Sequence, residues 1–469
     1  MNKLKSFFLI AVLSMAVTSR SQSDIMYFMN ETPQSSFINP AFGTKLGTYI
    51  SLPVLPNLSF DFHTSGFSYH DIIHKHPLYQ DSLQLDIQGF HGKLRKRNSF
   101  NFSSDINLLG FGFNAGKNHF SFDLTLTIDA RIGLEKSLLG FIIYGTDSED
   151  NGIIYNEPLA DASVYLSPSV SFARQITNKL TIGARVGLLF GIADITAKDM
   201  DISMTNQNGN IMLRSNIDIL FSTAFGGLQS NSFFNDKINW YDNASSSLNN
   251  ALKNRGGVID LGARYKINES MEVSAAVADI GFIKWRSNAT RIHSRNPNQT
   301  IDFYGLKSTL DSLSNDLDDY LERLGDTLNS LFDLKTTNLG SYTSRIPTKF
   351  YLGYTWHFAP TSYLHALYKG VWGNGYLDNY LSLLYGFHWK CLAGSVGNTF
   401  TLHTLLNPSF MVSITGAGMN LYLGSSFSFS NPVLNVADMS GFKIFMGFNI
   451  LIGRKPYWEH KLIPLPGIL

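Results

Sequence analysis

Apolar and polar residues alternate with period two over long stretches of this chain. From residue 120 to 129 every even position is apolar (Phe120, Phe122, Leu124, Leu126 and Ile128) and every odd position is polar. Residues 180–193 and 442–452 repeat the pattern. Successive side chains of a β-strand point to opposite faces, so each stretch predicts a strand with one apolar and one polar face. At about 3.3 Å per residue, such strands are long enough to cross a bilayer even when tilted.

The connections between these stretches are short and long in turn. Tight turns are predicted at 116–118, 177–178, 268–269, 360–361 and 416–418. Long polar connections are predicted at 66–99, 134–161, 194–256 and 287–345. A soluble β-sandwich also alternates, but short turns on one rim and long loops on the other are typical of outer-membrane barrels. The pattern therefore predicts an all-β fold, a transmembrane antiparallel β-barrel over residues 46–453.

We expect fourteen strands, an even number as in bacterial single-chain barrels. They are placed near 47–64, 100–114, 118–130, 161–176, 179–194, 257–267, 270–285, 345–358, 362–371, 379–389, 391–400, 408–415, 419–429 and 442–453. The first is the weakest, because Pro53 and Pro56 are typical of an edge or a kinked segment. Residues 206–221 carry a hairpin signal that we interpret as an extension above the membrane; if this hairpin spans the membrane instead, the count is sixteen.

The two ends of the chain lie outside the predicted barrel. Two lysines, an apolar stretch at 7–17 and small residues at Ser19 and Ser21 predict that residues 1–21 are a cleaved signal peptide. No run of 18 apolar residues follows, so an exported chain of this pattern is expected in the outer membrane. Residues 454–469 are expected to form a proline-bearing tail in the periplasm.

Composition narrows the classes of function. Charged residues make up 16% of the chain, against about 25% in ordinary soluble domains. The net charge of +1 gives no general attraction for nucleic acid. The single cysteine, Cys391, excludes a disulfide framework and a cysteine-based metal cluster. No hydrolase elbow, phosphate-binding loop or zinc-protease motif is present, so we expect no enzyme activity, no cofactor and no metal.

A short motif precedes the first strand. Asn39, Pro40 and Ala41, within residues 38–42, resemble the Asn-Pro-Ala motif in the N-terminal plug of the FadL-type fatty-acid transporter superfamily. The segment is also similar to that of Bacteroidota barrels of this build, including accessory barrels of type IX secretion and gliding. Residues 278–285 and 346–353 are similar to strands of an uncharacterised Bacteroidota outer-membrane family. The resemblance implies a fourteen-stranded barrel whose residues 22–45 fold into the lumen as a plug.

Charged residues occupy several positions on the polar face of the predicted strands. These lumen candidates are Asp123, Asp129, Arg185, Arg264, Lys266 and Lys443. They either line a path for a solute or form a structural network of paired charges around the plug, since barrel interiors are normally polar.

One long connection carries a leucine stripe. Residues 306–334 combine leucines at spacings of three and four with many acidic residues, which predicts an amphipathic helix in an outer loop. Its stripe, which includes Leu313, Leu317, Leu321 and Leu324, either packs on neighbouring loops or docks a partner protein. The basic run Lys93, Arg95, Lys96 and Arg97 is either solvated or contacts phosphates of lipopolysaccharide.

Two functional hypotheses follow from these features. The long outer loops, the leucine-striped helix and the proline-bearing tail favour a plugged accessory or docking subunit of an envelope export or surface machinery, with an envelope protein as partner. The alternative, which the FadL-type resemblance implies, is a passive channel for hydrophobic or small solutes, with a hydrophobic small molecule as ligand. Outer-membrane lipid and lipopolysaccharide are expected neighbours in both cases.

Overall fold

The computed structural model of the 469-residue chain describes most of the predicted barrel and part of the segment before it. The described residues are 24–29, 32–43, 47–51, 57–65, 67–75, 83–144, 154–155, 160–207, 210–228, 238–240, 244–295, 298–300, 334–402, 404–416, 418–429 and 438–453. The predicted signal peptide and the predicted tail lie outside these residues. So does the predicted helical insert, 306–334, except its last residue, where a strand begins.

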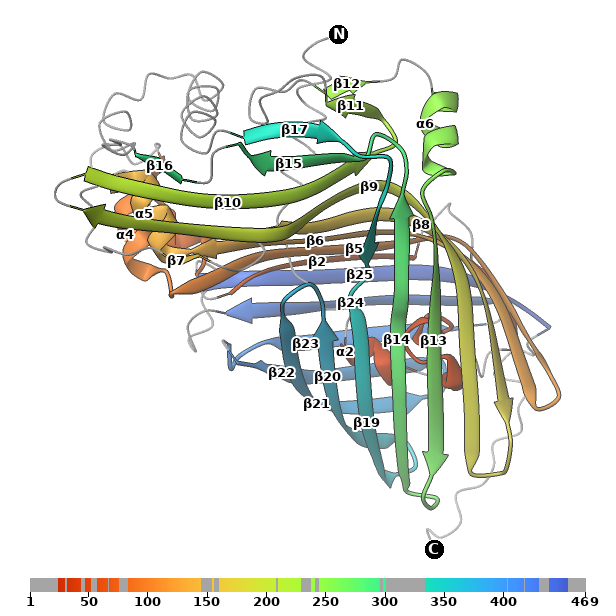
Figure 1. The fold of residues 1–469 in the computed structure, drawn as a ribbon. Helices are drawn as coiled ribbons and strands as arrows, with labels where there is room; N and C mark the ends of the chain where they lie inside the picture. Colours follow the sequence, from red (N-terminus) through yellow and green to blue (C-terminus); the bar gives the residue numbers. More distant parts are fainter. Residues whose placement is uncertain are drawn as a thin grey trace, which may run out of the picture.

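Fourteen antiparallel strand positions close into a barrel (Figure 1). In chain order they are β1 (Thr48–Ser51) with β2 (Asn57–Thr64), β5 (Arg97–Ala115), β6 (Asn118–Glu135), β8 (Ala160–Gln175), β9 (Leu180–Gln207), β13 (Arg255–Lys266), β14 (Met271–Trp285), β18 (Tyr342–Arg345) with β19 (Thr348–Ala359), β20 (Ser362–Trp372), β21 (Leu377–Trp389), β22 (Leu392–Thr401), β23 (Pro408–Thr415), β24 (Met419–Phe429) and β25 (Met439–Ile452). The last strand pairs back onto the first, with Ile450 opposite Ile50 and Lys443 opposite Asp61. The predicted antiparallel barrel of fourteen strands is confirmed.

The first strand is not an edge, although its prolines suggested one. Both of its halves, β1 and β2, pair with β5 on one side and with β25 on the other. Pro53 and Pro56 lie between the two halves, outside the described residues. Because the described halves donate to both neighbours, the ring of strands is complete at this position.

The outer face of the barrel is apolar around its circumference. Leu188 on β9, Leu352 on β19 and Phe282 on β14 are 61%, 59% and 52% exposed. Leu189, Tyr351 and Ile283, each next in sequence to one of these residues, are 1%, 4% and 0% exposed and point inward. A continuous belt of exposed apolar side chains is unfavourable in water and is expected where a barrel faces lipid tails.

An extension of the sheet rises from the rim that carries the long connections (Figure 1). Strand β9 continues past its barrel partners and turns into β10 (Asn210–Thr223). Strand β10 pairs with β15 (Thr290–Ser294) and β16 (Asn298–Thr300), and β15 pairs with β17 (Leu334–Asn338). Strand β7 (Ile154–Tyr155) joins the end of β9. This hairpin therefore adds no spanning strands, and the prediction that β9 ends near residue 194 was wrong because its ladder continues to Gln207.

The remaining elements are short. On the long-connection side they are β3 (Ile73–Lys75), β4 (Leu83–Leu85), β11 (Gly226–Leu228), β12 (Ile238–Trp240), η2 (Tyr69–Asp71), α4 (Ile87–Lys93), α5 (Lys136–Tyr144) and α6 (Ala244–Ala251). The segment before β1 holds α2 (Asp24–Tyr27), α3 (Ser35–Ile38) and η1 (Pro40–Phe42). Among the described residues, no helix is both long enough and apolar enough to cross a membrane.

The single cysteine tests the orientation of the barrel. Cys391 is exposed in the short turn between β21 and β22, on the rim that faces the periplasm in bacterial barrels. We expect a membrane-impermeant maleimide to leave Cys391 unlabelled on intact cells and to label it once the outer membrane is permeabilised. The matched variant Cys391→Ser/Leu402→Cys, with its cysteine at an 80% exposed position on the opposite rim, should be labelled on intact cells. Labelling of the wild-type protein on intact cells would reverse the orientation.

Candidate functional site

The segment that precedes the first strand lies inside the barrel (Figure 1). Helix α2 contacts β21, β22 and β23, whereas η1 contacts β8, β9 and β13. These two groups of strands are on different walls of the barrel, so residues 24–43 span the lumen. We call the described residues 24–29 and 32–43 the plug, and that they close the lumen stays a prediction.

Asn39 of the Asn-Pro-Ala motif organises the turn of this plug. Its side-chain oxygen accepts a hydrogen bond from the backbone N–H of Ala41 at 3.0 Å and so caps η1. Its amide nitrogen donates to the hydroxyl of Tyr27 at 3.0 Å, and that hydroxyl donates to Ser274 of β14 at 3.1 Å. Asn39 is fully buried, and Pro40 starts the 3-10 turn with a fixed φ. One side chain therefore shapes the turn and connects it to the wall.

Two glycines form the surface on which the motif rests. Gly183 of β9 and Gly262 of β13 are opposite each other in the sheet. A Cβ atom at Gly183 would lie 2.4 Å from the carbonyl carbon of Pro40. A Cβ atom at Gly262 would lie 2.1 Å from the side-chain oxygen of Asn39. The wall lacks side chains here because the plug backbone approaches it directly.

On the opposite wall the plug packs into an apolar chamber. Ile25, Tyr27, Phe28 and Met29 of the plug share one buried cluster with inward-facing side chains of the barrel. The barrel members of that cluster are Ala276, Ala278, Tyr351, Leu367, Leu384, Ala393, Met411, Tyr422 and Phe445. Phe28 also stacks on His365, with ring centroids 3.9 Å apart. Because barrel interiors are normally polar, an apolar inner wall of this size is a specific feature of this lumen.

Gln34 supplies a second polar anchor at the plug. Its amide nitrogen donates to the side-chain oxygen of Asn449 on β25 at 2.8 Å, and Asn449 donates back at 3.1 Å. Asn449 also donates to Asn420 on β24 at 3.0 Å. All three amides are buried, so the exchange satisfies groups that would otherwise be costly to remove from water.

The predicted lumen charges fall into two groups. Arg185 forms ion pairs with Asp260 and Asp279, and Lys443 forms one with Asp61 at 3.1 Å. Because these charges are paired within the wall, they agree better with the structural network than with a line of unpaired charges along a solute path. Asp123 and Asp129 are buried on the inner face of β6.

Arg264 and Lys266 lie elsewhere, at the short-turn rim. They line a cavity of about 370 Å³ beneath the plug, which Phe28 and Met29 also border. Arg264 lies 3.7 Å from Glu272. The six predicted residues therefore do not form one site.

Sequence reasoning missed four members of the charged network, which are Asp61, Asp260, Asp279 and Lys349. Asp260 is on the same face of β13 as Arg264, so the alternation pattern was sufficient to find it. Asp279 was hidden because a bulge with φ of 61° at this residue switches which face of β14 points inward. Its carboxylate accepts from Lys349 at 2.7 Å. Among the described residues, no group of three histidine, cysteine or acidic side chains is arranged to hold a metal ion.

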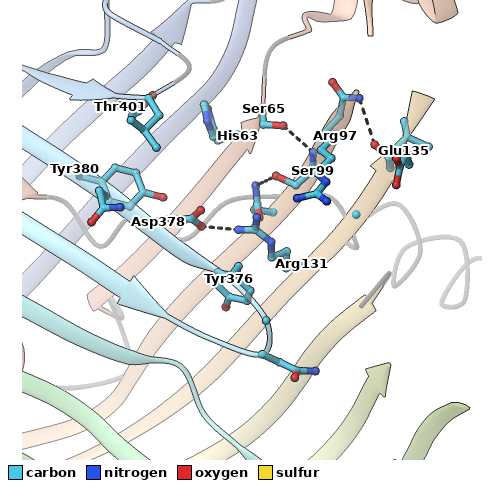
Figure 2. A pocket seen from close by; sticks show the side chains of 18 residues that line it. His63, Ser65, Arg97, Ser99, Arg131, Glu135, Tyr376, Asp378, Tyr380 and Thr401 are labelled. Carbon is cyan, nitrogen blue, oxygen red and sulfur yellow. Dashed lines mark hydrogen bonds and ion pairs between the residues drawn. The ribbon is translucent and has the colours of Figure 1, made fainter. Parts of the chain in front are cut away.

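A second barrier crosses the outer mouth (Figure 2). Arg131 of β6 and Asp378 of β21 form an ion pair of 2.5 Å, although their strands are third and tenth in the ring of fourteen. The guanidinium also lies 4.1 Å from the ring centre of Tyr376. Asn374, in the same loop as Tyr376, donates to the backbone carbonyl of Ala197 at 3.0 Å. The loop between β20 and β21 is therefore held across the lumen, and we call residues 373–376 the latch loop.

The chain was compared with known proteins. Residues 40–426 match the model of a family of unknown function, DUF5723. The chain belongs to this family. No curated protein matches it.

Solved barrels are similar to this DUF5723 member at low identity. The toluene transporter TodX of Pseudomonas putida is 12% identical over 93% of this chain and 96% of its own, with a TM-score of 0.41. A FadL homologue of Pseudomonas aeruginosa is 10% identical over 90% and 94%, with a TM-score of 0.43. A porin mutant of Rhodopseudomonas blastica is 8% identical over 86% and 99%, with a TM-score of 0.22.

The leucines proposed to dock a partner are not placed by the structure. Leu313, Leu317, Leu321 and Leu324 lie outside the described residues, so this docking helix stays a prediction for the family member.

The glycine surface gives a test of the plug. In the double variant Gly183→Ala/Gly262→Ala, two methyl groups would overlap the motif turn, so we expect the plug to be displaced. Single-channel conductance in planar bilayers should rise several-fold. The matched control Gly257→Ala lies on the same strand as Gly262, and its methyl group would meet only one backbone oxygen, at 3.8 Å. A double variant that keeps the closed state of the wild type would contradict this role of the glycines.

The latch gives a separate test. Asp378→Asn removes one charge of a pair whose side chains are 22% and 28% exposed, which is worth at most about 1 kcal/mol, or roughly a fivefold shift in equilibrium. In a background without residues 22–43, we expect this change to increase open-channel conductance. The control is Asp218→Asn, which removes an ion pair of the outer sheet. Equal conductance in the two variants would show that the latch does not narrow the mouth.

Proposed function

We propose that this protein is a passive, plug-gated channel of the outer membrane for small solutes with an apolar part. The observation that supports this most directly is the chamber that α2 fills. If the plug moved aside, the lumen would have one wall of leucine, methionine and aromatic side chains and another of glycine and polar groups. Such a two-faced passage suits a molecule that carries both apolar and polar surface.

The cavities on either side of the plug fit the same function. The cavity of about 370 Å³ lies at the periplasmic rim, and one of about 260 Å³ lies at the outer mouth. The plug is between them. A solute would pass from one to the other only when the plug leaves its seat, so the plug is the proposed gate and catalysis is not required.

The outer membrane is the proposed location. A closed barrel leaves no unpaired strand edge in lipid, and the apolar belt supplies the surface that lipid tails require. The predicted signal peptide agrees with export. Lys93, Arg95, Lys96 and Arg97 are near the outer rim, where contact with lipopolysaccharide phosphates stays a prediction.

We favour the channel over the accessory subunit that the sequence features favoured. Two features behind that hypothesis, residues 306–334 and 454–469, lie almost wholly outside the described residues, and the third, the long outer loops, forms in its described part the sheet extension and short elements at the rim. The described residues instead show a lumen with an apolar chamber and a cavity at each end. A subunit that only docks a partner would need none of these.

Plug deletion combined with one wall substitution tests the channel. Deleting residues 22–43 should raise both ion conductance and the flux of a small apolar dye into proteoliposomes. Adding Leu384→Glu should preserve the ion conductance and abolish most of the dye flux, because a buried carboxylate makes the chamber unfavourable for apolar solutes.

The control for this experiment is Leu384→Met, which keeps the volume and apolar character of the side chain and should keep the dye flux. Dye flux that is the same in the Glu and Met variants would contradict the chamber as the path. A deletion variant that conducts no more than the wild type would contradict the plug as the gate.

A further inference from the structure

The cavity at the outer mouth has a balanced set of charges. It is lined by Arg97 and Arg131 and by Glu135 and Asp378, which are two positive and two negative side chains (Figure 2). A cavity of this balance has no net field that would favour an anion or a cation. Its volume of about 260 Å³ is small for a ligand pocket and suits one or two sugar-sized rings.

Most N–H groups of Arg131, which lines the cavity, have no hydrogen-bond acceptor among the described residues. A guanidinium has five N–H groups, and Asp378 accepts from the Nη1 group of Arg131. The Arg131 guanidinium also lies over the ring of Tyr376. The Arg131 side chain is 22% exposed, and it points across the cavity in Figure 2. A ligand with several oxygen acceptors could therefore bind to Arg131 without displacing Asp378.

The cavity also offers a buried acceptor. The side-chain amide nitrogen of Asn101 donates to Ser99 at 2.8 Å, which fixes the orientation of the amide. The amide oxygen is buried and has no hydrogen-bond partner among the described residues. Asn101 is only 6% exposed, so leaving this oxygen without a donor is costly. A ligand that carries a hydroxyl group would supply the missing donor.

Two aromatic rings complete the lining. Tyr376 and Tyr380 come from the latch loop and from β21, and both border the cavity. Arg131 lies over one face of Tyr376 and the Nζ atom of Lys369 lies 4.9 Å from the ring centre of Tyr380, so the opposite, electron-rich faces are the ones that can pack against the weakly positive C–H groups of a saturated ring. The ligand that fits all of these features is neutral, has many hydroxyl groups and presents C–H groups on a ring face.

We propose that the outer cavity binds a neutral sugar residue, either free or at the end of a surface glycan. An acidic ligand would gain from Arg131 and Arg97 but would be repelled by Glu135 and Asp378. A purely apolar ligand would leave Asn101 and the free N–H groups of Arg131 unsatisfied. This site goes beyond the proposed channel, because binding here requires neither plug movement nor transport.

The test is ligand-observed NMR on the full chain in a polyoxyethylene detergent, which has no sugar of its own. The probes are the methyl glycosides of glucose, galactose and mannose, with glucuronate and glucosamine as charged analogues. We expect at least one neutral glycoside to give saturation-transfer signals, and both charged analogues to bind more weakly. Binding only of glucuronate, or of none of the probes, would overturn the proposal.

Variants locate the binding to this cavity. Asn101→Leu should weaken glycoside binding about tenfold, because it removes the buried acceptor while leaving the Arg131–Asp378 pair in place. Tyr380→Leu should also weaken it. The control Gln88→Ala, an exposed position on α4 that does not line the cavity, should bind as the wild type does. Heat-modifiable gel migration of each variant verifies that the barrel is folded, and folded Asn101→Leu and Tyr380→Leu variants with unchanged binding would overturn the site.

A competition arm distinguishes the two sources of the sugar. If the natural ligand is a surface glycan, then core oligosaccharide released from lipopolysaccharide should displace the glycoside at lower concentration than the free sugar does. If the oligosaccharide fails to compete, the site binds free sugar. Neither result depends on dye flux, so the outcome is separate from that of the channel experiments.

Discussion

Backbone hydrogen bonding in lipid is the constraint from which this structure follows. A strand in the hydrocarbon layer has no water to satisfy its N–H and C=O groups, so the sheet must close. The sheet closes where β25 pairs with β1 and β2. Closure fixes, for every strand, which alternate side chains point outward and which point inward. On each strand the apolar side chains at alternate positions must then face lipid. The side chains between them face the lumen. A ring of fourteen strands is wider than its inward side chains can fill, and the remaining space holds either water, as in porins, or another part of the chain. The strand number therefore leaves room for the plug, and the plug's own sequence places it there.

The plug is held by two different kinds of contact. Against β9 and β13 it makes close backbone approaches, because Gly183 and Gly262 leave no side chain between them and the motif, and its neutral hydrogen bonds go to β14 and β25. Against the chamber wall it buries aromatic and aliphatic side chains such as Phe28 and Met29. The first contact is geometrically specific, since a single methyl group would prevent it. The second is tolerant of shape, since any apolar surface of similar size can replace it. A solute that enters the chamber would therefore compete with the second contact first.

The sequence predicted the barrel well because period-two alternation is a local property of each strand. Residues 118–130, for example, place Asp123 on the inner face with no knowledge of any other strand. The sequence predicted the site less well, because the site is made of contacts across the lumen. Arg131 and Asp378 are far apart in the chain and come from strands on opposite walls, and no spacing rule connects them. The bulge at Asp279 broke the alternation on which the inner-face assignments depended. Asn39 was found because its role as a cap is local, whereas its partners Tyr27 and Ser274 depend on the packing of the plug.

The arrangement of charges decides between a permanent seal and a plug that can leave. The ion pairs of the lumen join one barrel strand to another: Arg185 with Asp260, Lys349 with Asp279, and Lys443 with Asp61. The anchors described for the plug, Asn39, Gln34 and Tyr27, are neutral. Removing one partner of a buried ion pair leaves an uncompensated charge and costs several kcal/mol, roughly 3–5. Removing a neutral hydrogen bond costs about 1 kcal/mol when water can replace the partner. Departure of the plug would therefore leave the charged network of the wall intact. A plug that sealed the barrel permanently would be held most firmly by ion pairs with the wall. The anchors described for this plug include no ion pair, which favours a plug that moves.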